Sequence, residues 1–166
     1  MQKKVFQILV DNTSGVLSRI AGLFSRRGYN IDSITAGVTG DPRFTRITIV
    51  TSGDDEILDQ IEKQLEKLVD VRHIKELKPG NSIYRELALV KVRTGEDRRS
   101  GIIEAASIYH AKIVDSDKES LTVEIVGNQS KIEAFLSLIS NYEILELART
   151  GIAGLERGSE NVVFLD

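Results

Sequence analysis

The sequence predicts an α+β fold made of two similar modules in tandem. Its hydrophobic periodicity runs strand, helix, strand, strand, helix, strand, and then the same order begins again. Between the two runs, residues 78–82 read KPGNS, a composition typical of a linker. The length of 166 residues is enough for two small domains that each bury a core.

The first module, residues 1–78, begins with a strand over residues 4–10, and its other strands are predicted over 31–38, 44–51 and 69–77. Its first helix follows residue 15 and ends before Gly28, a typical C-cap. The second helix opens with acidic residues 54–56, which suit the positive end of a helix dipole. The apolar stripes of the two helices comprise Val16, Leu17, Ile20, Leu23 and Phe24, and Ile57, Leu58, Ile61, Leu65 and Leu68.

The second module, residues 83–166, repeats the pattern with strands over 84–93, 111–115, 121–126 and 144–149. Its helical stripes are Ile102, Ile103, Ala106 and Tyr109, and Ile132, Phe135, Leu136 and Ile139. Two copies of this split β-α-β order predict two tandem ferredoxin-like βαββαβ modules, each with an antiparallel sheet and both helices on one face. The bare face of each sheet must then be solvated or covered by a partner, so we expect the protein to assemble.

The composition argues against several classes of function. The chain has no cysteine, which excludes disulfides and thiolate chemistry, and no apolar run of about 18 residues that could cross a membrane. Residues 1–10 faintly imitate a signal peptide, but Gln7 interrupts the apolar run and no cleavage site follows. The net charge of −3 and the aromatic content of 5% argue against binding to nucleic acid, including by an RNA-recognition module of the same strand order. We therefore expect a cytoplasmic protein with no nucleic-acid or membrane partner.

No converging set of titratable residues predicts a catalytic or metal centre. His73 and His110 are far apart and belong to no metal-ligand spacing. Residues 54–56 (DDE) could be a metal cluster, but a solvated helix start is the favoured interpretation. Residues 151–158 (GIAGLERG) are rich in glycine yet lack the spacing of a dinucleotide-binding loop. The sequence predicts a protein that is not itself an enzyme.

One segment resembles a ligand site, the loop from Asp11 to Leu17 between the first strand and the first helix. Free N–H groups at a helix start attract a carboxylate, and Gly15 would let a ligand approach the backbone. Asn12 offers a donor and an acceptor beside that place. The same residues also suit an ordinary loop, with Ser14 as the N-cap and Gly15 as a turn residue. Asn30, which begins the second strand, allows the same two interpretations.

The sequence of this region closely resembles the ACT domain of the small, regulatory subunits of acetohydroxyacid synthase (acetolactate synthase). The resemblance is carried by residues 11–34 (DNTSGVLSRIAGLFSRRGYNIDSI), 40–48 (GDPRFTRIT) and 60–71 (QIEKQLEKLVDV). It continues through residues 85–92 (RELALVKV), 111–115 (AKIVD), 149–151 and 157–158, and thus covers nearly the whole chain.

The resemblance implies a non-catalytic subunit that activates a large catalytic subunit and confers feedback inhibition by valine or a related branched-chain amino acid. It implies that thiamine diphosphate, Mg²⁺ and FAD are held by that partner and that this chain binds no cofactor. It also implies a homodimer through the ACT domains, with the effector at the interface. The effector contacts carried over by position are Asn12, Gly15, Val16 and Leu17 from one subunit and Asn30 and Ile31 from the other. The alternative is a free-standing amino-acid sensor that regulates another enzyme.

Overall fold

The computed structural model describes residues 1–159, which form two compact units. The first unit contains residues 1–83 together with the described residues from Ile152 on, and the second contains Tyr84–Gly151. The chain leaves the first unit beside the predicted linker, where residues Pro79–Asn81 form a short 3₁₀ helix, η1. The sequence predicted a second module that ends at residue 166. In the structure the described residues from 152 on belong to the first unit. Residues 160–166 lie outside the described part.

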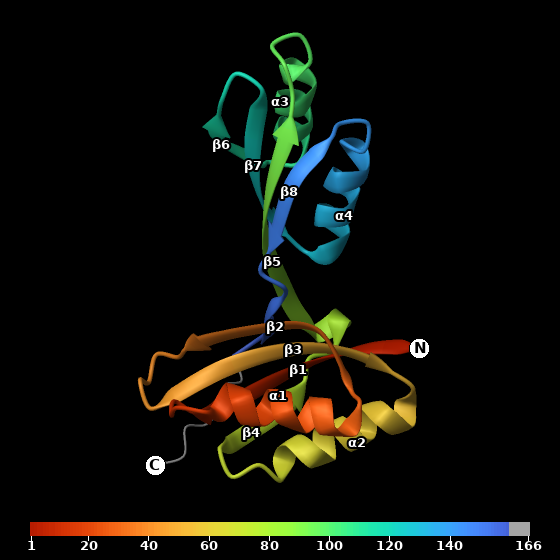
Figure 1. Cartoon of the computed structure of the whole chain (residues 1–166). Helices are drawn as coiled ribbons and strands as arrows, with labels where there is room; N and C mark the ends of the chain where they lie inside the picture. The colour runs from red at the N-terminus through yellow and green to blue at the C-terminus, as the bar shows by residue number, and fades with distance from the viewer. Residues whose placement is uncertain (160–166) are drawn as a thin grey trace. The chain divides into compact units, whose positions relative to one another are not determined.

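The first unit has the predicted order of strands and helices (Figure 1). Its elements are β1 (Gln2–Asp11), α1 (Val16–Arg27), β2 (Asn30–Val38), β3 (Phe44–Gly53), α2 (Asp55–Glu66) and β4 (Val71–Glu76). The four strands form an antiparallel sheet in the order β2-β3-β1-β4, and both helices cover one of its faces. Alternate residues of β1 and β3 point to the helices and are fully buried among them, including Phe6, Ile8, Ile47 and Ile49. This period of two is the pattern that predicted the strands.

The helix ends of the first unit follow from local chemistry. Gly28 ends α1 in the left-handed conformation, with φ of 68°, as its position predicted. Asp54 caps α2 by accepting a hydrogen bond from the backbone N–H of Ile57 at 2.9 Å. The acidic residues 54–56 therefore start a helix.

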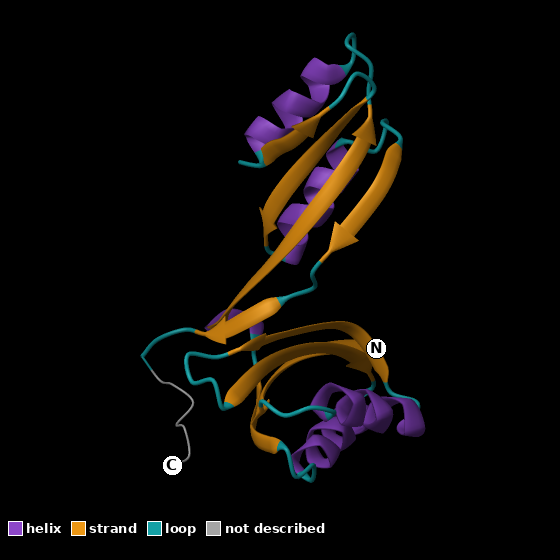
Figure 2. Cartoon of the chain, turned by 60° about the vertical axis from the view of Figure 1, so that its left-hand side comes forward, coloured by secondary structure: helices purple, strands orange, loops and turns teal. Residues whose placement is uncertain are grey.

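The second unit repeats the fold (Figure 2). Its elements are β5 (Ser82–Arg93), α3 (Arg99–Ile108), β6 (Lys112–Ser116), β7 (Ser120–Gly127), α4 (Gln129–Leu138) and β8 (Ile144–Arg149). The sheet order is β6-β7-β5-β8, and a separate core packs beneath α3 and α4 around residues such as Val90, Val123 and Phe135. The predicted fold class, two tandem ferredoxin-like modules, is confirmed.

A ninth strand, β9 (Ala153–Glu156), was not predicted. It pairs with β5, and its segment lies on the face of the first sheet opposite α1 and α2. On that face Val5, Gln7 and Leu9 of β1 are all buried. The expectation of a bare sheet face is therefore wrong for the first unit, because the chain returns and covers it.

Candidate functional site

The loop after β1 turns into α1 at Gly15, which adopts the left-handed conformation with φ of 84°. Gly15 is the N-cap residue, and no side chain caps the helix. The prediction that Ser14 is the N-cap is therefore wrong, because the chain enters the helix one residue later through a conformation that favours glycine. The first turn of α1 contains no acidic residue, so its N–H groups meet no carboxylate from the turn itself.

The side chain of Asn12 is bonded to the turn between β2 and β3. Its Nδ2 donates to the carbonyl of Pro42 at 3.0 Å, and its Oδ1 accepts from the hydroxyl of Thr45 at 3.1 Å. The Asn12 backbone N–H also donates to the carbonyl of Arg43 at 2.8 Å. Asn12 therefore holds the loop against this turn, and within residues 1–159 one of its two amide hydrogens has no hydrogen-bond partner.

The space above Gly15 is occupied by Arg19 of the same helix. A Cβ built on Gly15 would lie 2.8 Å from Nη1 of Arg19. The guanidinium is held there by Asp70, whose Oδ2 accepts from Arg19 Nε at 2.5 Å, and this hydrogen bond raises the pKa of Arg19. Glycine at position 15 thus makes room for a cation beside the positive end of the helix.

A second guanidinium borders the loop on the β4 side. Arg72 donates from Nε and Nη2 to the two carboxylate oxygens of Asp11 at 2.7 and 2.8 Å. These hydrogen bonds raise the pKa of Arg72. The backbone N–H of Asp11 also donates to the carbonyl of Asp70 at 3.0 Å, which ties the start of the loop to the corner between α2 and β4.

The remaining predicted effector contacts differ in how far their side chains are buried. Val16 is buried in the core, so only its backbone N–H faces the loop, whereas Leu17 is exposed. Asn30 is exposed at the start of β2, where its carbonyl accepts from Thr51 Oγ1 at 2.6 Å and its Nδ2 donates to Asp32. Ile31 is partly buried and packs against the core of the unit.

The two halves of the predicted site do not meet within one chain. Strand pairing places Asn30 opposite Ser52, at the end of the sheet where β1 begins, whereas Asp11 at the other end pairs with Phe44. The twelve residues of α1 separate the two ends by about 18 Å along the helix axis. One subunit therefore brings together residues 12–17 but leaves Asn30 and Ile31 far from them.

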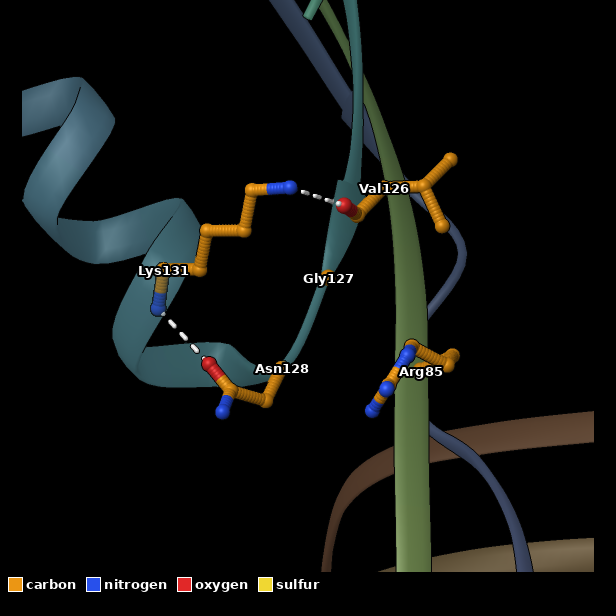
Figure 3. A pocket seen from close by; sticks show the side chains of 5 residues that line it. All are labelled: Arg85, Val126, Gly127, Asn128 and Lys131. Carbon is orange, nitrogen blue, oxygen red and sulfur yellow. Dashed lines mark hydrogen bonds between the residues drawn. The ribbon is translucent and has the colours of Figure 1, made fainter. Parts of the chain in front are cut away.

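The second unit has a concavity of about 190 Å³ that the sequence did not indicate (Figure 3). It is lined by Arg85, Val126, Gly127, Asn128 and Lys131. Asn128 caps α4 by accepting from the backbone N–H of Lys131 at 2.8 Å, and Lys131 Nζ donates to the carbonyl of Val126 at 2.9 Å. The Asn128 side chain is thus used in starting the helix, and the Lys131 side chain is bonded to β7.

Comparison with known proteins agrees with the observed fold. Residues 6–73 match the family model for the "AHAS small subunit-like ACT domain", and residues 85–158 match the model for the "Small subunit of acetolactate synthase". The chain is 46% identical to a probable acetolactate synthase small subunit of Methanothermobacter thermautotrophicus, over 95% of each chain. It is 43% identical to the isozyme 3 small subunit of Escherichia coli, over 95% of this chain and 98% of that one.

A solved structure extends the likeness to three dimensions. The crystal structure of the acetolactate synthase small subunit from Thermotoga maritima superposes with a TM-score of 0.87 at 40% identity, covering 96% of this chain and all of that one. Both units are therefore matched in sequence, and 96% of the chain is matched in fold. The chain belongs to the family of acetolactate synthase small subunits.

Proposed function

We propose that this chain activates the catalytic large subunit of acetolactate synthase and makes it sensitive to feedback inhibition by valine or a related branched-chain amino acid. This role belongs to branched-chain amino acid biosynthesis in the cytoplasm. The observation that carries the effector part is the separation of residues 12–17 from Asn30 and Ile31 at opposite ends of α1. Such a site is incomplete in one chain and complete between two.

The start of α1 has the chemistry to bind the carboxylate of an amino acid. Its first N–H groups have no partner within the helix, no side chain caps them, and the helix dipole favours negative charge there. The guanidinium of Arg19 lies beside them. The exposed side chain of Leu17 offers apolar surface to a branched aliphatic effector.

A second copy supplies the other half. β2 is an edge strand of the described sheet, and Ile34 and Val38 expose apolar surface on it. A twofold axis beside β2 would run the two edge strands antiparallel. Asn30 and Ile31 of one subunit would then lie near the loop of residues 12–17 of the other.

The chemistry is proposed to take place on the large subunit, which would hold thiamine diphosphate, Mg²⁺ and FAD. Within residues 1–159 no group of three or more His, Cys, Asp or Glu side chains is placed to bind a metal ion. In the same part of the chain, no helix is long and apolar enough to cross a membrane. A free-standing sensor is disfavoured because the match to the subunit family extends over residues 85–158.

The test is reconstitution with the large subunit of the same host. Acetolactate formation from pyruvate is measured for the large subunit alone, for this chain alone, and for the two together, with thiamine diphosphate, Mg²⁺ and FAD present. We expect no rate from this chain, a higher rate from the mixture, and a fall of that rate when valine is added. A mixture no faster than the large subunit alone would refute the activating role, and a rate unaffected by valine, leucine and isoleucine would refute the effector role.

A further inference from the structure

The segment Ile152–Arg157, here called the strap, crosses the sheet of the first unit on the face opposite the helices. Thr35 of β2 donates from its hydroxyl to the carbonyl of Ile152 at 3.0 Å. Arg46 of β3 donates from Nη2 to the carbonyl of Gly154 at 2.8 Å. Lys75 of β4 forms an ion pair with Glu156. Three of the four strands therefore hold the strap through polar contacts, and its strand β9 also pairs with β5.

The C-terminal end of the strap is hydrogen-bonded to Asn81 of η1. The backbone N–H of Arg157 donates to the carbonyl of Asn81 at 2.8 Å, and Asn81 Nδ2 donates to Glu156 Oε1 at 3.0 Å. Asn81 lies just before the chain enters the second unit, and the strap begins just after the chain leaves it. The hydrogen bonds of the strap thus hold the segment that follows the second unit beside the segment that precedes it.

Few apolar side chains of the strap itself are buried. Ile152 is 7% exposed, but Ala153 points outward and Leu155 is 58% exposed. Neither Ile152 nor any other strap residue belongs to the hydrophobic core beneath the helices. Segments with few buried apolar contacts open locally while the rest of a domain stays folded.

Arg46 adds to this tendency. Within residues 1–159 its hydrogen-bond acceptors are uncharged, namely Gln7 Oε1 and the Gly154 carbonyl. Partial burial removes water from the guanidinium and lowers its pKa, because a charged group is less stable out of water. The hydrogen bond from Arg46 to the strap is therefore partly offset by the desolvation of the guanidinium.

The strands under the strap also carry the two halves of the effector site. Thr35 lies on β2, the strand that begins at Asn30, and Arg46 pairs in register with Leu9, close to the end of β1 at Asp11. A ligand that orders either strand end therefore acts on strands that bind the strap.

We propose that the strap is a releasable clasp, which leaves and rejoins the sheet while the first unit stays folded, and that an effector bound to the first unit favours the docked state. Because the strap directly follows the second unit in sequence, effector binding would change how the chain that leaves that unit is held. The second half of this proposal rests on the proposed function, and the first half does not.

Amide hydrogen exchange of the full-length protein tests the clasp. The variant Thr35→Val removes one donor to the strap at nearly constant volume, and Thr122→Val makes the same change on β7 of the second unit as a control. We expect the Ala153–Glu156 amides to exchange at least about tenfold faster than those of β1, as a local opening does. Losing one partly buried hydrogen bond should speed their exchange a further fivefold or so in Thr35→Val. Thr122→Val should leave the strap unchanged, and strap amides that exchange as slowly as β1 in both proteins would overturn the clasp.

The same measurement with valine tests the coupling, with calorimetry on the same sample to record binding. Bound valine should slow strap exchange at least about twofold in the wild type, as expected for a ligand that favours the docked state. If calorimetry shows binding and strap exchange stays constant, the coupling is refuted. If calorimetry shows no binding, the effector assignment in the proposed function fails, and the comparison of Thr35→Val with wild type still decides the clasp.

Discussion

The guanidinium of Arg19 lies over Gly15, with Nη1 2.8 Å from the position that a Cβ would occupy. The carboxylate of Asp70 fixes the guanidinium there through Nε. Glycine at this position is thus required twice, once by the left-handed backbone and once by a neighbouring side chain. The structure therefore explains this glycine without a ligand, whereas the sequence alone suggested that it leaves room for one.

Gly15→Ala is therefore expected to destabilise the protein. The left-handed conformation costs a residue with a Cβ about 1–2 kcal/mol, and Arg19 must also move. Urea unfolding followed by circular dichroism measures the loss. Gly40→Ala is the control, because its backbone lies outside the left-handed region and no neighbouring atom lies within 4 Å of the added Cβ. Equal stability of the two variants would contradict the prediction.

A mixed-subunit experiment tests whether the effector site is shared. Gly15→Asp should abolish valine binding, because the added carboxylate lies at the anion-attracting helix start, and Asn30→Ala should weaken binding strongly from the other subunit. When the two variants are unfolded together and refolded, half of the dimers are mixed and each mixed dimer has one intact site. Calorimetry should then recover about a quarter of the wild-type valine sites.

The control for this experiment is each variant refolded alone, which should remain without tight valine binding. A site contained within one chain would be damaged in every subunit of the mixture. No recovery of binding after mixing, with mixed dimers present by native mass spectrometry, would therefore disprove a shared site.

The turn that holds Asn12 should resist acid through Asp41. Hydrogen bonds from the Arg43 side chain and backbone lower the pKa of Asp41 from its ordinary value of 3.8. Because the folded-state pKa lies below the unfolded one, this contact stabilises the fold above the ordinary pKa and is lost as pH falls through the folded-state pKa. A carboxyl-carbon NMR titration should place the Asp41 midpoint below 3.8, and Arg43→Met should move it upward. An unchanged midpoint in Arg43→Met would show that another group causes the shift.

Arg149 should contribute to the stability of the second unit through the buried carboxylate of Glu86. Arg149 Nε donates to Glu86 Oε1 at 2.7 Å, and Glu86 is 5% exposed. Arg149→Met would leave this charge buried without a cation, at a loss of about 2–3 kcal/mol after allowance for the partial exposure of Arg149.

The control is Glu133→Gln, which removes the second carboxylate bound to Arg149. Because the Glu133 side chain is 54% exposed, its loss should cost less than about 1 kcal/mol. Urea unfolding of both variants measures the difference, and the prediction is wrong if Glu133→Gln is as unstable as Arg149→Met.

The order of elements could be predicted because each βαββαβ pattern is local in sequence. The strand over residues 144–149 was predicted with its observed bounds, and Gly28 was predicted to end α1, because alternation and helix caps depend on near neighbours. The shared effector site stays a prediction. Its residues follow a strand and a helix, and the structure places residues 12–17 and Asn30 at opposite ends of the first sheet.

The strap could not be predicted from local pattern. Its strand is four residues long and contains Gly154, and its partners Thr35 and Arg46 lie 117 and 108 residues away in sequence. One signal was present in Gln7, a polar residue at a buried position of an otherwise apolar strand. A buried polar side chain requires a partner, and here that partner is Arg46, which lies beneath the strap. The N-cap was missed because Ser14 suits this role by residue type, whereas the backbone turns one residue later.

The late position of the strap in the sequence has a consequence during protein synthesis. Residues 152–157 are made only after the whole second unit, so the nascent first unit has its sheet face uncovered while residues 84–151 are translated. At translation rates of about 5–20 residues per second, this interval lasts several seconds. During that time the strap's contacts with Thr35, Arg46 and Lys75 are absent, and the face is open to premature association with another nascent chain.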